Sequence, residues 1–162
     1  MKTQKQEFLE MLSAYQGIIH KVNLIYFPVP EDREDNFQEV VLGMWNAYPR
    51  LENKEKIASW IYAIAINTSV SKIRKDSRYV FSDRMESQGR QTTTEKIEDT
   101  LDFQHLLDAI RGLKEIDRSI MLLYLEDYSY HEIAEITGIN SSNVGARIHR
   151  AKTQLEKRLK LK

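Results

Sequence analysis

The sequence predicts an all-α protein of two small helical domains joined by a flexible linker. Apolar residues recur at helical spacing along most of the chain, no useful stretch alternates apolar and polar residues as a strand does, and the helical spacing vanishes between Ser82 and Thr100. Of the 162 residues, 41% are hydrophobic, which is enough for one core or two small ones. We therefore expect domains at residues 1–81 and 101–162 and a linker at 82–100.

Three long helices are expected in the first domain. The first ends before Pro28 and Pro30, the second covers about residues 31–48 before Pro49, and the third covers about residues 54–78. The positions expected to be buried are Phe8, Met11, Leu12, Tyr15, Ile18, Ile19, Val22, Ile25 and Tyr26, then Phe37, Val40, Val41, Met44, Trp45 and Tyr48, then Ile57, Ile61, Ile64, Ala65, Thr68 and Ile73. Three such apolar stripes are hidden from water only if they pack on one another, which predicts a helical bundle.

The second domain is expected to begin with two helices and to continue with a helix-turn-helix. Ser129 and Glu132 form a capping-box pattern at the start of a short helix, Gly138 supplies a left-handed residue at its end, and Asn140 or Ser141 caps the next helix. The expected inner positions are Leu101, Phe103, Leu106, Leu107, Ile110 and Leu113, then Ile116, Ile120, Leu123 and Tyr124, then Ile133, Ala134, Ile136, Ile139, Val144, Ile148 and Ala151. The alternative is an antiparallel helical hairpin whose basic end is merely solvated.

The last helix is expected to present a polar and basic side. The residues on or near this side are Ser141, Ser142, Asn143, Gly145, Ala146, Arg147, His149 and Arg150. Small polar groups there can approach base edges, and arginines can contact bases or phosphates. The whole chain has 24 Lys and Arg against 24 Asp and Glu, but residues 147–162 contain seven basic residues and one acidic residue, a net charge of +6. Residues 82–102 have a net charge of −3, so partners of both signs are indicated.

Several classes of function are disfavoured. The absence of cysteine excludes disulfides, thiolate nucleophiles and Cys-ligated metal centres. The longest apolar run, residues 60–66, is far shorter than the roughly 20 residues of a membrane span, so a cytoplasmic protein without membrane insertion of its own is expected. No catalytic residue, metal site or cofactor is expected, because no phosphate loop occurs and the histidines lack ligand spacing. The open alternatives are a purely structural adaptor and an enzyme whose metal ligands are Glu95, Glu98, Asp99 and Asp102, near His105.

The first domain contains two further polar features. Asp35, Gln38 and Glu39 lie at helical spacing on one face, for which a solvated helix surface is the simpler interpretation. Trp60 and Tyr62 are aromatic residues in a basic neighbourhood, a combination typical of proteins that stack unpaired bases, although core packing explains Trp60 equally well. The basic residues of this neighbourhood are Lys54, Lys56, Lys72, Arg74 and Lys75.

The order of these features resembles the extracytoplasmic-function (ECF) sigma factors of bacterial RNA polymerase, in the sigma-70 family, over nearly the whole chain. Residues 34–41 (EDNFQEVV) are similar to the family's polymerase-binding motif, and residues 60–67 (WIYAIAIN) with 73–75 (IRK) to its promoter-melting helix. Residues 132–134 (EIA), 138–139 (GI) and 144–152 (VGARIHRAK) are similar to the region that binds the −35 element.

The resemblance implies promoter recognition and melting without catalysis by this chain. It places Asp35, Gln38, Glu39 and Leu42 against the β′ clamp of core RNA polymerase, with the β flap as a further contact of the polymerase, and the acidic linker in polymerase channels. It implies an anti-sigma factor as a partner, which the family commonly has. The residues implied at the −10 element, next to the loop at 50–56, are Lys54, Lys56, Trp60, Asn67, Arg74 and Lys75. Those implied at the −35 element are Ser141, Ser142, Asn143, Arg147, Arg150 and Lys152.

The chain departs from the family pattern in two DNA-binding regions. Ala63 and Ile66 occupy positions that are basic in many members, and Gly145 occupies one that is commonly Lys or Arg. The main rival interpretation is a two-domain helix-turn-helix regulator that binds duplex DNA without acting through core polymerase.

Overall fold

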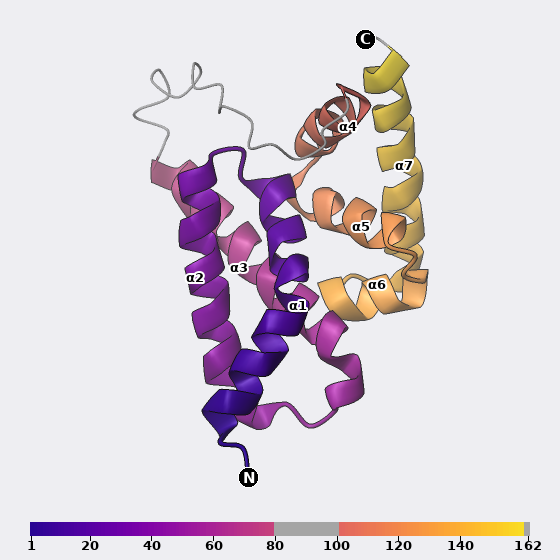
Figure 1. Ribbon diagram of the computed structural model, residues 1–162. Coiled ribbons are helices and arrows are strands. Elements are labelled where there is room, and N and C mark those ends of the chain that lie inside the picture. Colours follow the sequence, from indigo (N-terminus) through magenta and orange to yellow (C-terminus); the bar gives the residue numbers. More distant parts are fainter. Residues whose placement is uncertain (80–100, 161–162) are drawn as a thin grey trace. The chain divides into compact units, whose positions relative to one another are not determined.

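The computed structural model describes residues 1–79 and 101–160, which form helices joined by short connections (Figure 1). Within them there are seven α-helices, two short 3-10 helices and no strand, which confirms the all-α prediction. The chain divides into two compact units, Met1–Ser71 and Lys72–Lys162. The expected linker at 82–100 lies outside the described residues. None of the described helices is long and apolar enough to span a membrane.

The first unit is built on three long helices, as the sequence predicts, and the last of them continues beyond the Ser71 boundary to Tyr79. They are α1 (Gln4–Tyr26), α2 (Pro30–Ala47) and α3 (Ile57–Tyr79), with the 3-10 turns η1 (Tyr48–Arg50) and η2 (Lys54–Lys56) between the last two. Thr3 begins α1 with a capping box to Gln6, and Pro30 occupies the first turn of α2, where its missing amide hydrogen is not needed. Pro49 lies in η1 and ends α2, because proline cannot continue the helical hydrogen bonds.

The buried face of α3 differs from the expected one. Its buried residues are Ile61, Tyr62, Ala65, Ile66, Ser69 and Val70, whereas Ile57, Ile64, Thr68 and Ile73 are only partly covered. Apolar residues surround most of the N-terminal half of α3, so their spacing alone does not decide which side faces inward. Two other expected core residues, Tyr15 and Trp45, are exposed by 39% and 38%.

Three buried polar side chains join the helices of the first unit. The Asn36 side-chain amide on α2 donates to Asn23 Oδ1 on α1 (2.6 Å) and to Ser69 Oγ on α3 (2.9 Å). Ser69 in turn donates to the Ala65 carbonyl oxygen (2.7 Å), and all three polar side chains are buried. Because a buried polar group is costly unless it is paired, these contacts favour one register of the three helices.

Asn36→Ala is expected to lower the free energy of unfolding of the first unit by about 2 to 3 kcal/mol, because it leaves Asn23 Oδ1 buried without a donor and opens a small cavity. Urea unfolding followed by tryptophan fluorescence measures this directly, since Trp45 and Trp60 both lie in this unit. Asn46→Ala, at an exposed site of the same helix, is the control. Equal losses for the two variants would contradict a stabilising role of the buried amide.

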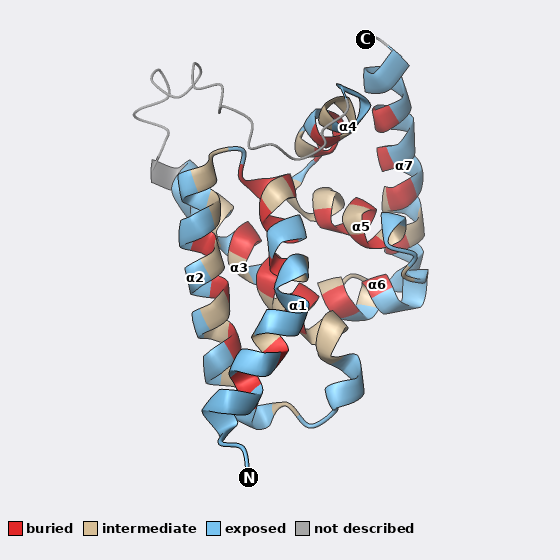
Figure 2. Cartoon of the chain, in the orientation of Figure 1, coloured by how far each residue is buried: buried red, intermediate tan, exposed pale blue. Residues whose placement is uncertain are grey.

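The second unit contains the predicted helix-turn-helix. Helices α4 (Leu101–Arg111) and α5 (Glu115–Leu125) precede α6 (Tyr130–Thr137) and α7 (Ser141–Lys160). Ser129 and Glu132 form the capping box of α6 in both directions, and Gly138 has the expected left-handed conformation with φ of 79°. The buried residues of α6 and α7 are Ile133, Ile136, Val144, Ile148, Ala151 and Leu155 (Figure 2). Leu101 and Phe103, which were expected inside, are exposed at the start of α4.

Adding one methyl group is expected to have opposite effects at two glycines of this motif. Gly138→Ala should destabilise the second unit by about 1 to 2 kcal/mol, because a Cβ atom disfavours the left-handed conformation. Gly145→Ala should stabilise it by up to about 1 kcal/mol, because its Cβ would be 3.4 Å from Tyr130 Cε2, an ordinary contact, within a helix. Amide hydrogen exchange of the second unit in the full chain measures both changes. A shift of the same sign in both variants would contradict this account.

Candidate functional site

The recognition surface of the helix-turn-helix begins at the first turn of α7. Asn140 Oδ1 accepts hydrogen bonds from the backbone N–H of Asn143 (2.9 Å) and from Ser142 Oγ (2.8 Å), so Asn140 is the residue that caps the helix. Ser141, Ser142 and Asn143 are exposed. The N-terminal part of the second helix is the part that contacts base edges in helix-turn-helix proteins. The cap therefore fixes the backbone on which these short polar side chains stand.

Two of the basic residues predicted on α7 lie at the edges of its exposed side. Arg147 Nη1 is 2.9 Å from Asp117 Oδ1 on α5, and the two side chains are 31% and 18% exposed. On the other edge, Lys152 Nζ lies 4.4 Å from the centre of the Tyr124 ring. Its side-chain hydrogen bond with Tyr124 raises the pKa of Lys152 above the ordinary value. Both cations thus contact the body of the domain.

Between these edges, α7 presents an exposed strip. Ala146, His149 and Arg150 lie there with the polar residues of the first turn. Arg150 makes no side-chain hydrogen bond or ion pair with any other described residue. His149 is also exposed but is not among the residues expected from the sequence at the −35 element. Its helical spacing from Ser142 and Ala146 nevertheless places it on the same strip.

A second surface lies on α2 of the first unit. Asp35, Gln38, Glu39 and Leu42 are all exposed there, and Leu42 retains 60% of its accessible surface. The spacing of these residues places them along one face of the helix. A single exposed leucine is common at protein surfaces, so Leu42 indicates a binding surface only together with the apolar groove beside it.

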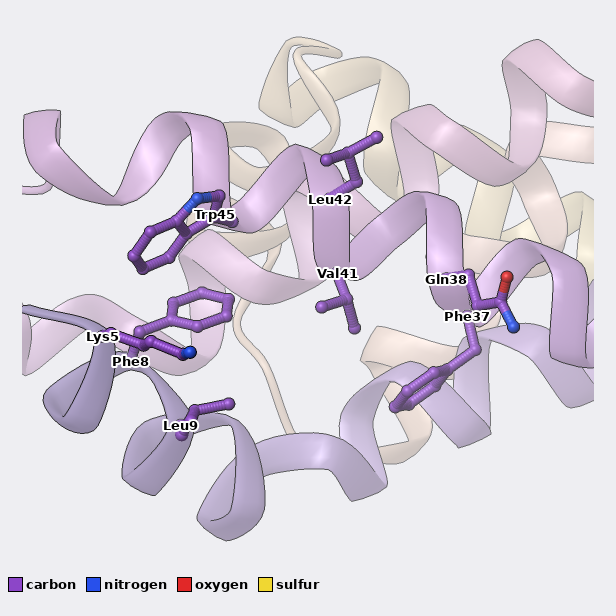
Figure 3. Close-up of a pocket in the computed structure, with 8 residues that line it drawn as sticks. All are labelled: Lys5, Phe8, Leu9, Phe37, Gln38, Val41, Leu42 and Trp45. Carbon is purple, nitrogen blue, oxygen red and sulfur yellow. The ribbon is translucent and has the colours of Figure 1, made fainter.

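An apolar groove of about 600 Å³ adjoins this surface, between α1 and α2 (Figure 3). Gln38 and Leu42 belong both to the groove and to the α2 surface. The Trp45 ring forms part of the wall and packs edge-on against Phe8, with ring centres 5.1 Å apart. Residues lining the groove are Lys5, Phe8, Leu9, Phe37, Gln38, Val41, Leu42 and Trp45. The apolar spacing of α2 assigned Trp45 to the core, and its exposure is explained by this groove.

The residues expected at the −10 element are distributed along η2 and α3. Lys54, Lys56, Asn67, Arg74 and Lys75 are exposed. Trp60 is half-buried, and its ring centre is 6.4 Å from that of Tyr48. One suggestion from the sequence is wrong: Tyr62 is only 2% exposed and belongs to the core, so it is unavailable for stacking on a base.

Most of the acidic residues of the enzyme alternative lie outside the described residues. Residues 1–79 and 101–160 contain no group of three or more His, Asp or Glu side chains arranged to bind a metal. Asp102 and His105 lie on α4, whereas Glu95, Glu98 and Asp99 lie outside the described residues.

Both surfaces lie in segments that match known protein families. Residues 11–79 match the family model of sigma-70 region 2, and residues 103–155 match that of sigma-70 region 4. The chain is 30% identical over 135 residues to the RNA polymerase sigma factor YlaC of Bacillus subtilis. This alignment covers 80% of the present chain and 78% of YlaC. It is also 26% identical to the sigma factor SigV of the same organism, over 93% of this chain and 89% of that protein.

Solved structures of sigma factors have a similar fold. The sigma factor RpoE of Bartonella quintana, crystallised with the anti-sigma factor NepR, matches with a TM-score of 0.75 and 25% identity over 96% of each chain. CnrH, solved with the cytosolic domain of CnrY, has a TM-score of 0.68 and covers 98% of this chain and 90% of that one; at 17% identity the likeness concerns the fold alone.

Proposed function

Because the chain belongs to the ECF sigma factors of RNA polymerase, we propose that its two described surfaces, on α2 and on α7, together direct the core polymerase to promoters. Residues 1–81 bind core polymerase and the −10 element, residues 82–100 form an acidic linker, and residues 101–162 bind the −35 element. The rival regulator that acts without polymerase is not favoured, since both sigma-70 regions occur in their usual order. In this proposal the polymerase performs all of the chemistry and the chain itself is not an enzyme.

The exposed surface of α2 binds the polymerase. Asp35 and Glu39 attract a basic face of the β′ clamp, and Leu42 supplies the apolar centre that binding surfaces need in addition to charge. The neighbouring groove extends the apolar area through Trp45, which is 38% exposed. The β flap is the proposed contact of the second domain.

The −10 element binds along η2 and the exposed side of α3. Trp60 is half-buried, and the exposed Lys54 and Lys56 precede it by six and four positions in the chain, which supports stacking of an unpaired base beside cations that hold its phosphates. Capturing an extruded base offsets the few kcal/mol of unstacking. Asn67, Arg74 and Lys75 continue this surface along α3.

The capped helix α7 is the observation that supports the DNA-binding role best. It presents Ser141, Ser142 and Asn143 from a fixed first turn, and Arg150 from the strip behind them. With Arg147 and Lys152 at the edges, these six residues form the proposed −35 surface.

Run-off transcription in vitro tests the function. Purified chain mixed with core polymerase should initiate at defined positions on a genomic template library, whereas core alone should not. The chain without polymerase should bind the same promoters poorly, because two small domains on a long linker are not held at promoter spacing. Specific binding without polymerase, and no initiation with it, would instead support the rival regulator.

An anti-sigma factor is the proposed regulatory partner, in the cytoplasm. The solved structure of RpoE with NepR, which has a similar fold, is a complex of a sigma factor with an anti-sigma factor. This complex supports the proposal for the present chain, and co-purification from a cell extract followed by loss of polymerase binding tests it.

Binding of the second domain to duplex promoter DNA is expected to weaken steeply with salt. If α7 neutralises about four phosphates, log K should fall with log salt concentration at a slope of about −3.6, because counterions are released. Titrations of holoenzyme on promoter fragments with and without the −35 segment isolate this contribution. An affinity difference that does not depend on salt would contradict a phosphate-binding α7.

A further inference from the structure

The ion pair between Asp117 and Arg147 connects the recognition helix to α5. Arg147 Nη1 and Asp117 Oδ1 are 2.9 Å apart, and Asp117 is the more buried partner, with 18% of its side chain exposed. Asp117 lies in the first turn of α5, where the helix dipole favours a carboxylate. A part-buried charge pair of this geometry favours one arrangement of the two elements, because a shift of either helix or the loss of one partner leaves the other charge part-buried and unpaired.

On the other edge of α7 from this ion pair, a second cation, Lys152, contacts the rest of the domain. Residues 147 and 152 are five positions apart, which corresponds to about 140° around the helix axis. Arg147 therefore holds one edge of α7 to α5 through Asp117, and Lys152 holds the other edge through the Tyr124 ring at 4.4 Å. The strip with Ala146, His149 and Arg150 lies between them. Together with the apolar core, these edges determine how α7 is rotated about its own axis.

From this geometry we infer that Asp117 is a positioning residue for promoter recognition, acting through Arg147 to fix the rotation of α7. The inference rests on the proposed function and deepens it. Arg147 contributes to the −35 surface by holding α7 to α5 through its ion pair with Asp117, rather than by neutralising a phosphate. Base contacts tolerate little displacement, so a small rotation of α7 about its axis moves Asn143 and Arg150 away from the base edges that they contact.

The test uses holoenzyme assembled from the full chain and core polymerase. The probe is a pool of duplex DNA with a randomised segment at the −35 position and an unpaired −10 segment. The affinity of each holoenzyme for the sequences that the wild type selects is then compared with its affinity for a duplex whose upstream segment is scrambled. The variants are Asp117→Asn, Arg147→Asp and the exchanged pair Asp117→Arg with Arg147→Asp. Asp108→Asn is the matched control, because it loses a longer pair, 3.8 Å from Arg111, through a carboxylate that is 54% exposed.

We expect Asp117→Asn to reduce the preference for the selected upstream sequence about fivefold, the size of a modest coupling free energy. Binding to DNA that has only the −10 segment should be unchanged, and so should the Asp108→Asn control. The exchanged pair should recover most of the preference that Arg147→Asp loses, because it restores the ion pair. The salt slope of the exchanged pair should equal that of the wild type. All measurements are made well below the thermal midpoints found by circular dichroism.

Three results would overturn the inference. They are an exchanged pair that binds no better than Arg147→Asp, a salt slope of the exchanged pair that falls by about 0.9 as for one lost phosphate contact, and an Asp117→Asn variant that behaves as Asp108→Asn does. Asp117→Glu keeps the charge and should retain the preference, which gives a second measurement if the asparagine variant folds poorly. A wild-type holoenzyme that ignores the −35 segment would instead overturn the proposed function itself.

Discussion

Reversing the charges of Asp35 and Glu39 together is expected to weaken binding of the chain to core RNA polymerase by about a hundredfold. Both carboxylates are exposed on one face of α2, where no contact within the first unit depends on them. Facing a basic partner surface, each reversal converts an attraction into a repulsion, and a hundredfold change corresponds to about 2.7 kcal/mol. Surface-immobilised polymerase titrated with the purified variant measures the change.

The matched control reverses two exposed carboxylates of α1 in the same unit, Glu7 and Glu10, of which Glu10 forms an exposed ion pair with Lys2. This variant has the same net charge as the first but leaves the proposed polymerase surface intact, so it should bind the polymerase within about threefold of the wild type. Tryptophan fluorescence should show both variants folded. Similar affinities for the two variants would mean that α2 does not bind the polymerase through this face.

Replacing Arg150 by alanine is expected to weaken binding to the −35 element by about 10- to 100-fold, or about 1 to 3 kcal/mol. Its side chain is exposed on the strip of α7 and forms no ion pair with the described residues, so no internal contact competes with DNA for it. Holoenzyme titrated on promoter fragments with intact and scrambled −35 segments measures the loss. The stability of the second unit should not change.

Lys157→Ala is the control for this substitution. Lys157 is also exposed and basic on α7 but lies two turns beyond Arg150, away from the first turns that contact bases. The Lys157→Ala variant should bind all duplexes more weakly by a similar small factor. Its preference for the selected −35 sequence over a scrambled one should not change. An Arg150→Ala variant that likewise loses affinity without losing preference would assign Arg150 to the phosphates.

Local sequence features predicted the helix-turn-helix in detail. The Ser129–Glu132 capping box, the left-handed Gly138 and the inner positions Val144 and Ile148 are all confirmed. Each depends on contacts within a few residues, or on a strong amphipathic pattern, so the information is contained in a short stretch of sequence. The same is true of α1 and α2, whose ends are set by a capping box and by prolines.

The side of a helix that faces inward was harder to predict where most sides are apolar. On α3, Tyr62 is buried and Ile57 and Ile64 are only partly so, because α3 turns Ser69 toward Asn36 on α2. Trp45 on α2 has the spacing of a core residue but borders an open groove with α1. These outcomes depend on how neighbouring helices approach, and apolar spacing within one helix does not specify that approach.

The sequence by itself therefore determined the helices, their caps and the basic and acidic residues available for polymerase and promoter. Only the tertiary structure decided which of those charges face outward. Arg147 and Arg150 are both arginines of the same helix, yet Arg147 contacts Asp117, thirty positions earlier in the chain, whereas Arg150 is exposed. The physical reason is that capping and helical periodicity act within a few residues, whereas the partner of a charged side chain is set by packing between segments far apart in sequence.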